Sequence, residues 1–311
     1  MLKTILVPVD GTHVSEAALP YAEALAHRTG AAVVIMHAVQ PTSVWGDVDA
    51  TYTRAVQDAE DYVDSLAQSL IDRGTRVDTA VPVGGASAWI RDEIQLRHVD
   101  LVVMATHDRA GLSRWLHGSV AETVAAHAGA PVMLVRAAEG MRPTERIGQP
   151  HPVLLVPLDG SELAEGALPI ATTLATACGA SVVLVGVVPV PGQLVAGDGG
   201  VVTYVEEDIE QLTSEATDYL ARIRDRFPSG VRVESVVRHG SPGVQIADEA
   251  EARGAMGVVM ATHGRTGLTR SLLGSVAGEV VHRGATPVVL VRPQTASAEA
   301  ESAIAAAAAS A

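Results

Sequence analysis

The residues of this chain best suited to chemistry lie in a short segment that occurs twice. Its second copy has Ala261 and Gly264, then nine residues, then Gly274 and Ser275, and the apolar run 258–260 leads into it. Glycine permits a tight turn and a close backbone approach to a ligand. A helix that begins after Gly274 would present unpaired N–H groups beside a hydroxyl. This combination favours the binding of a phosphate group.

The first copy has the same spacing but a different residue at one position. It has Ala105 and Asp108, then nine residues, then Gly118 and Ser119, so a carboxylate stands where the second copy has Gly264. A carboxylate adds bulk and like charge beside a phosphate, unless it points to solvent or holds a divalent metal. The second copy is therefore the stronger candidate for phosphate binding.

Histidine and arginine flank both copies. His107 and His263 are of the residue type most often used as a general base, but no Ser-His-Asp or metal-ligand set accompanies them in sequence. Arg109 and Arg265 are suited to donate charge-assisted hydrogen bonds to phosphate oxygens or to remain solvated. We expect no catalytic residue here.

The elements that must position these segments alternate between strands and helices. Apolar runs predict strands at 3–9, 33–38, 76–83, from 101, and at 131–135, and again at 153–158, 182–187, 231–237, 258–260 and 287–291. Helical periodicity fills the intervals. Short connections and right-handed crossovers imply an α/β protein of two tandem, doubly wound, five-stranded parallel sheets of the Rossmann type.

In such sheets, ligands bind beyond the carboxyl ends of the strands, where the strand order reverses. The ends of the first and fourth strands should therefore be neighbours, which brings Asp10 near Ala105 and Asp159 near Ala261. A glycine follows each of the two aspartates.

The helix after each first strand carries two local signals. Thr12 and Ser161 are suitable N-caps, and one helix is expected from Thr12 to about residue 26. Pro20 and Pro169 lie inside these predicted helices, where each should remove a hydrogen bond and bend the axis.

The repeat spacing predicts the domain organisation. We expect a first domain at 1–137, a polar linker at 138–151, a second domain at 152–293 and a low-complexity tail at 294–311. A glycine-rich excursion at 189–202 has no equal in the first half and is a candidate lid.

Composition excludes several classes of function. A net charge of −14 and 3% aromatic residues disfavour nucleic acid as a partner. No apolar run approaches the roughly 20 residues that cross a bilayer, and the start lacks a signal-peptide pattern. We therefore expect a cytoplasmic protein without membrane contact. The single Cys178 excludes an internal disulfide and is expected to pack at a helix end.

These motifs resemble the universal stress protein family in tandem form, over nearly the whole chain. Nucleotide-binding members of that family have Gly, two residues, Gly, nine residues, Gly, then Ser or Thr. Ala261 replaces the first glycine in the second half, which ordinary backbone dihedrals can absorb. Asp108 is the larger departure in the first half.

The resemblance implies an adenine-nucleotide-binding fold, with ATP as the ligand and Mg²⁺ as a companion. It places Asp10 and Asp159 near the base or ribose, and phosphates at the two Gly-Ser pairs. The implied binding residues in the second half are Asp159, Val187, Ala261, Gly264, Arg265, Gly267, Gly274, Ser275 and Val276. Those in the first half are Asp10, Ala38, Ala105, Arg109, Gly111, Gly118, Ser119 and Val120.

The function that the resemblance implies is a stress response through nucleotide-dependent conformation or partner choice, with at most slow ATP hydrolysis. No Walker lysine follows a glycine loop. Alternatives are an interaction module with degenerate sites, an enzyme of the wider adenine-nucleotide α-hydrolase-like group, or a flavin or nicotinamide ligand. The apolar last strands should pair within the chain, and a homodimer is expected.

Overall fold

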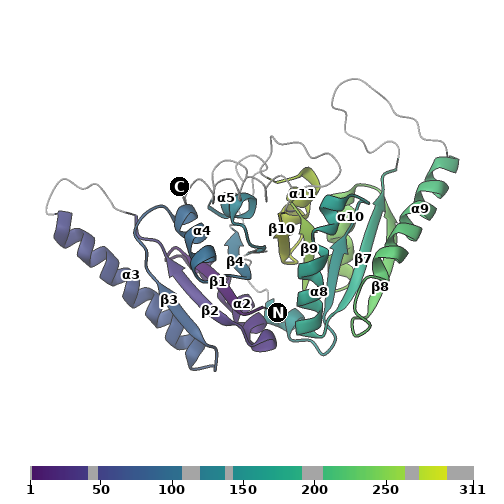
Figure 1. Cartoon of the computed structure of the whole chain (residues 1–311). Coiled ribbons are helices and arrows are strands. Elements are labelled where there is room, and N and C mark those ends of the chain that lie inside the picture. Colours follow the sequence, from purple (N-terminus) through teal and green to yellow (C-terminus); the bar gives the residue numbers. More distant parts are fainter. Residues whose placement is uncertain are drawn as a thin grey trace, which may run out of the picture.

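The computed structural model of the chain describes residues 2–40, 48–106, 120–136, 143–190, 206–262 and 273–292. Ten strands form a single sheet in the order β3-β2-β1-β4-β5-β10-β9-β6-β7-β8 (Figure 1). Several predictions lie outside the described residues: the lid beyond residue 190, the tail, and the roles of His107, Asp108, Arg109, Gly111, Gly118, Ser119, His263, Gly264, Arg265 and Gly267.

The first half contains five parallel strands. They are β1 Thr4–Val9, β2 Ala32–His37, β3 Val77–Ala80, β4 Leu101–Thr106 and β5 Val132–Arg136. Its helices are α1 His13–Glu16, α2 Leu19–Thr29, α3 Val48–Ile71, α4 Ala86–Leu96 and α5 Val120–His127. The strands β1, β2, β4 and β5 are short apolar runs buried on both faces, whereas the outer strand β3 contains Asp78 and Thr79 and is only partly buried.

The second half repeats this arrangement. Its strands are β6 Val153–Pro157, β7 Ser181–Val188, β8 Val233–His239, β9 Gly257–Ala261 and β10 Val288–Val291. Its helices are α7 Glu162–Glu165, α8 Leu168–Cys178, α9 Glu206–Arg224, α10 Pro242–Ala252 and α11 Ser275–Arg283. The predicted fold class, two tandem doubly wound α/β units with five parallel strands each, is confirmed.

The two halves join through their last strands. β5 and β10 pair antiparallel, with Met133 opposite Val289, so the apolar edge that each half would expose alone is covered within the chain. The predicted intrachain pairing is confirmed. All other neighbouring strands are parallel. The strands β1–β5 therefore run in the direction opposite to β6–β10, and the carboxyl ends of the two sets lie at opposite ends of the strands in the sheet.

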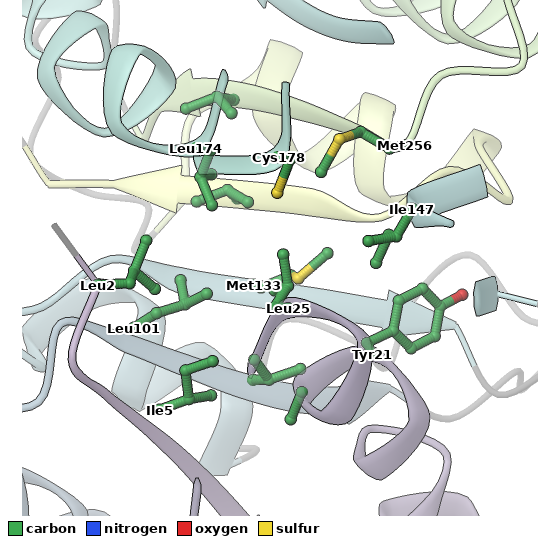
Figure 2. Close-up of a cluster of buried hydrophobic side chains, with 14 of the residues drawn as sticks. Leu2, Ile5, Tyr21, Leu25, Leu101, Met133, Ile147, Leu174, Cys178 and Met256 are labelled. Atoms are coloured by element: carbon green, nitrogen blue, oxygen red, sulfur yellow. The ribbon is translucent and has the colours of Figure 1, made fainter. Parts of the chain in front are cut away.

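Helices cover both faces of the sheet and the core is continuous across the halves. In Figure 1, α4, α5, α10 and α11 lie in the upper part of the view, whereas α2 and α8 lie in the lower part. Figure 2 shows the core beneath α2 and α8, where Leu25 and Met133 of the first half approach Leu174 and Cys178 of the second. Cys178 is buried and free, which confirms its predicted packing role.

The helix predicted after β1 is in fact two helices, and the predicted effect of proline is wrong. Ala17 ends α1 and Ala18 begins α2, so Pro20 occupies the first turn of α2. The N–H groups of a first turn have no intrahelical partner, so proline costs no hydrogen bond there. Pro169 lies equivalently in α8.

The predicted N-caps of the short helices are confirmed. Thr12 accepts a hydrogen bond from the Ser15 N–H, and Ser161 accepts one from the Ala164 N–H. Each cap stabilises a helix of only four residues at the edge of the sheet where the first strand of its half ends.

The stretch expected to be a linker contains a helix, α6 Pro143–Ile147, that is anchored to both halves. The Ile147 side chain is fully buried in the core that Figure 2 shows. Arg28 of α2 donates to the Ile147 carbonyl, and Arg146 donates to the Thr286 hydroxyl. The connection therefore contributes to the packing between the halves.

Candidate functional site

The strand order reverses between β1 and β4 and between β6 and β9. Ile5 pairs with Leu101 in the first half, and Leu155 pairs with Val258 in the second. Asp159 follows β6 and Ala261 ends β9, so both lie at the carboxyl edge of this reversal, where doubly wound sheets bind ligands.

Each aspartate at this edge closes its own turn. Oδ1 of Asp10 accepts hydrogen bonds from the N–H of Thr12 at 3.1 Å and from its hydroxyl at 2.6 Å. Oδ1 of Asp159 accepts the equivalent bonds from Ser161 at 3.0 and 2.6 Å. One carboxylate oxygen of each therefore holds the turn in shape, a role that the sequence analysis did not assign.

The start of α11 lies directly beyond the end of β9. The Gly274 N–H donates to the Thr262 carbonyl at 2.8 Å, and the Thr262 N–H donates to the Val291 carbonyl at 2.9 Å. Gly274 is the N-cap, with extended backbone (φ −60°, ψ 154°) and no side-chain cap. The exposed Ser275 follows it. The first-turn N–H groups and the helix dipole therefore suit an anion.

The other described residues of the expected second site lie on the elements that form this edge. Val187 is in the last part of β7, the strand next to β6, and is half-buried. Val276 is in the first turn of α11 and is half-buried. Gly264, Arg265 and Gly267, between these elements, lie outside the described residues.

The first half positions its expected residues in the same way. Ala38 directly follows β2, Ala105 is in β4 beside β1, and the exposed Val120 begins α5. Together with Asp10 these residues belong to the ends of elements at one edge of the sheet. Arg109, Gly111, Gly118 and Ser119 lie outside the described residues.

A tyrosine–glutamate pair near each aspartate turn was missed from the sequence. The Tyr62 hydroxyl of α3 donates to Oε1 of Glu16 in α1 at 2.9 Å, and Tyr219 of α9 donates to Glu165 of α7 at 3.2 Å. Burial and then the glutamate hydrogen bond raise the pKa of Tyr62. The available signal was that an Ala-x-Asp-Tyr pattern recurs in both halves.

A histidine in the first half was also missed. His37 ends β2 opposite Val9, and its ring meets that of Tyr62 edge to face at 5.7 Å. Burial lowers the pKa of His37, although the nearby carboxylate of Asp10 acts in the opposite direction. Gly186 occupies the equivalent position in the second half. A comparison of the two repeats would therefore have identified His37 as a difference between them.

The described part of the chain offers neither a metal-binding cluster nor a membrane-spanning helix. No three or more His, Cys, Asp or Glu residues there are grouped to hold a metal ion. None of the helices described combines the length and apolarity needed to cross a membrane.

Comparison with known proteins agrees with the geometry. The profile of the universal stress protein family matches residues 1–136 and 152–292. The chain belongs to the universal stress protein family. Its two matches make it a tandem member, as the sequence motifs predicted.

Universal stress proteins of similar length resemble the whole chain. One from Mycolicibacterium smegmatis is 28% identical over 305 residues, covering 93% of this chain and 97% of that protein. One from Mycobacterium tuberculosis is 27% identical over 310 residues, covering 93% and 94%. The crystal structure of a universal stress protein from Archaeoglobus fulgidus superimposes with a TM-score of 0.65 at 19% identity, covering 93% of this chain and 96% of that one. At that identity the likeness supports the fold alone.

Proposed function

We infer that this universal stress protein binds an adenine nucleotide, ATP, in its second half, with the phosphates at the start of α11. Ser275 would donate its hydroxyl to a phosphate oxygen, beside the N–H groups of the first helical turn. Asp159 and the backbone near Val187 would lie on the nucleoside side. Mg²⁺, where present, would neutralise part of the phosphate charge.

One observation carries this proposal: α11 begins directly beyond the carboxyl end of β9, where the Gly274 N–H donates to the Thr262 carbonyl. The lack of a side-chain cap does not distinguish α11, because α2, α4, α8 and α10 also begin without one, whereas α1 and α7 are capped. The first-turn N–H groups of α11 lie where a doubly wound sheet binds its ligand. The Gly274 dihedrals are ordinary for any residue, so a substitution there tests the space beside the helix start and not the backbone conformation.

A matched pair of substitutions tests the proposal. Gly274→Val adds bulk on the path of the phosphate without straining the backbone, so we expect loss of most ATP binding by calorimetry in a folded protein. Gly85→Val is the control, because Gly85 is also an extended, uncapped N-cap glycine and a Cβ there would meet nothing within 4 Å. Equal ATP affinity in wild type and both variants would refute the site.

The proposed action is a nucleotide-dependent change in conformation or partner choice during stress, in the cytoplasm, rather than turnover. Support comes from the far end of α11, where Arg136 of β5 donates to the His282 carbonyl at 2.8 Å. The helix that would hold the phosphates is thus bonded to the first half. Hydrogen exchange with and without ATP should show altered protection at α11 and at the end of β5.

Homodimerisation is part of the proposal, by a surface other than the last strands. Because β5 and β10 cover each other, the outer edges of the sheet are β3 and β8. Analytical ultracentrifugation should show a dimer. If the protein is a monomer at all concentrations, homodimerisation is refuted, but the proposal of nucleotide binding is not affected.

A second candidate function is a non-catalytic dimerisation or interaction module in which one or both nucleotide sites are degenerate. Asp108 favours it for the first half, because a carboxylate stands where the second half has Gly264. Mass spectrometry of nucleotide released from the purified protein tests the version in which both sites are degenerate, since such a module would release none.

A further inference from the structure

The two halves share a frame in which corresponding positions can be compared. Each has an Asp-Gly turn closed by a hydroxyl residue, and each has the tyrosine–glutamate hydrogen bond between its long and short helices. In β2, His37 follows Met36, which pairs with Pro8. In β7, Gly186 follows the residue that pairs with Pro157. His37 and Gly186 therefore occupy the same place.

The His37 ring packs against the turn that carries Asp10. A Cβ on Gly11 would lie 3.9 Å from Cε1 of His37, and the Tyr62 ring meets the imidazole on another side at an angle of 79°. Nδ1 of His37 is buried and has no hydrogen-bond partner among the residues that the structure describes. Leaving a buried polar group without a partner costs about 1–3 kcal/mol. A ligand that supplied a partner would recover this free energy.

The charge state of the ring decides which partner suits it. Burial favours the neutral form, against the pull of the Asp10 carboxylate, and Tyr62 faces the ring from α3 with its hydroxyl bonded to Glu16. A neutral imidazole has one donor and one acceptor. It therefore suits a hydroxyl or a base edge better than a phosphate dianion.

The position of His37 in the sheet points to the same part of a nucleotide. β1 lies between β2 and β4, and α5 is the next described element after β4. Neighbouring strands are about 4.8 Å apart, so the ends of β2 and β4 are separated by about 10 Å. A nucleotide with its phosphates beyond β4 would extend its nucleoside part toward β2.

We propose that His37 hydrogen-bonds an uncharged polar group on the nucleoside part of the ligand in the first half, a contact that Gly186 denies to the second half. The inference rests on the proposed function, because it requires a nucleotide. It makes His37 a specificity-determining residue, and the two halves differ in how they distinguish nucleosides.

The test uses the full chain with Gly274→Val, so that the first half is measured alone. We expect His37→Ala to weaken binding of AMP and of ATP by the same factor, about tenfold, at pH 8 with Mg²⁺. The control is His27→Ala, because His27 contacts Thr75, which precedes β3 at the opposite edge of the sheet. 2′-Deoxy-AMP lacks the ribose 2′-hydroxyl, and IMP lacks the amino group of adenine. If His37→Ala no longer changes the affinity for one of these analogues, the group missing from that analogue is the one that His37 binds.

Three outcomes would overturn the inference. In the first, His37→Ala leaves the affinity for AMP and ATP unchanged. In the second, His37→Ala weakens ATP binding more than AMP binding, and only near pH 6. In the third, the first half binds neither nucleotide. If His37→Ala does not fold, His37→Asn replaces it in the test, because asparagine can form hydrogen bonds but lacks the geometry of the ring. His37→Asn should also weaken the binding of AMP and ATP by the same factor. Failure of the wild-type chain to bind ATP in either half would instead refute the proposed function.

Discussion

The guanidinium of Arg28 in α2 donates a hydrogen bond to the carbonyl of Ile147 at 3.2 Å, so a helix of the first half holds the end of α6. The same guanidinium reaches the Cys178 carbonyl of the second half at 3.4 Å. From α6 itself, Arg146 donates to the Thr286 hydroxyl at 3.0 Å. The two arginines thus join three parts of the chain through part-buried hydrogen bonds.

Arg146→Ala should lower the free energy of unfolding by about 1–3 kcal/mol, because it leaves the buried Thr286 hydroxyl without this partner. Urea denaturation followed by circular dichroism measures the change. Arg224→Ala is the matched control, since Arg224 pairs with the side chain of its exposed neighbour Asp225, and we expect a change within about 0.5 kcal/mol. Equal effects of the two substitutions would contradict the anchoring role of α6.

Removing a hydroxyl should have opposite effects at two tyrosines. Tyr21 is 1% exposed, its hydroxyl has no partner within the described part of the chain, and burial raises its pKa to about 12. Tyr21→Phe should therefore leave stability unchanged or raise it by up to about 1–3 kcal/mol. Tyr62→Phe removes the bond to Glu16 and should lower stability by about 0.5–1.5 kcal/mol. Thermal unfolding of both variants checks the prediction, which a destabilised Tyr21→Phe would contradict.

Stability should fall in mild acid because of His282. Burial, and then the charge of Arg136, lower the pKa of His282, so the unfolded chain binds a proton at a higher pH than the native protein does. The free energy of unfolding is then lost as the pH falls from about 6.5 toward the lower native pKa, by at most about 1.4 kcal/mol per pH unit.

His282→Gln should make the stability curve flatter than that of the wild type between pH 7 and 5. His13→Gln is the control, because the His13 side chain is fully exposed. Chemical denaturation across this pH range provides the measurement. Curves of the same slope for wild type and His282→Gln would show that His282 does not contribute.

Asp108→Gly should strengthen nucleotide binding in the first half. At about 4–6 Å from a phosphate, with an effective dielectric constant near 20, a carboxylate repels each unit charge by roughly 3–4 kcal/mol before screening. We expect the gain in ATP affinity to be largest without divalent metal and smaller with Mg²⁺, which can bridge carboxylate and phosphate. Calorimetry with Gly274→Val in the background measures it. An affinity that Asp108→Gly leaves unchanged without metal would contradict the repulsion.

The fold could be predicted because its signals are local and redundant. The run 258–260 is apolar at every position, as a strand buried on both faces must be, and β9 occupies Gly257–Ala261. The break between α1 and α2 could not be predicted in the same way. Pro20 suits a helix interior badly and a first turn well, and the choice depends on where the chain must turn to cover the sheet.

The candidate site was predictable only in its backbone part. The spacing of the glycines predicted the start of α11 to within one residue, because the Gly274-Ser275 pair stands directly before the helical segment. The roles of Ile147 and His37 depend on contacts with residues more than 20 positions away in sequence, such as Arg28 and Tyr62. A lone isoleucine in a polar stretch, or a histidine at a strand end, carries no periodic signal of those contacts.

The antiparallel junction of β5 and β10 has an evolutionary consequence. A protein that made this junction between two identical chains would have to carry every substitution on both sides of it. Here each side is encoded separately, so His37 and Asp108 can occupy one side while Gly186 and Gly264 occupy the other. Covalent linkage also keeps the two unlike units paired one to one at any concentration, which leaves each free to specialise without producing mismatched assemblies.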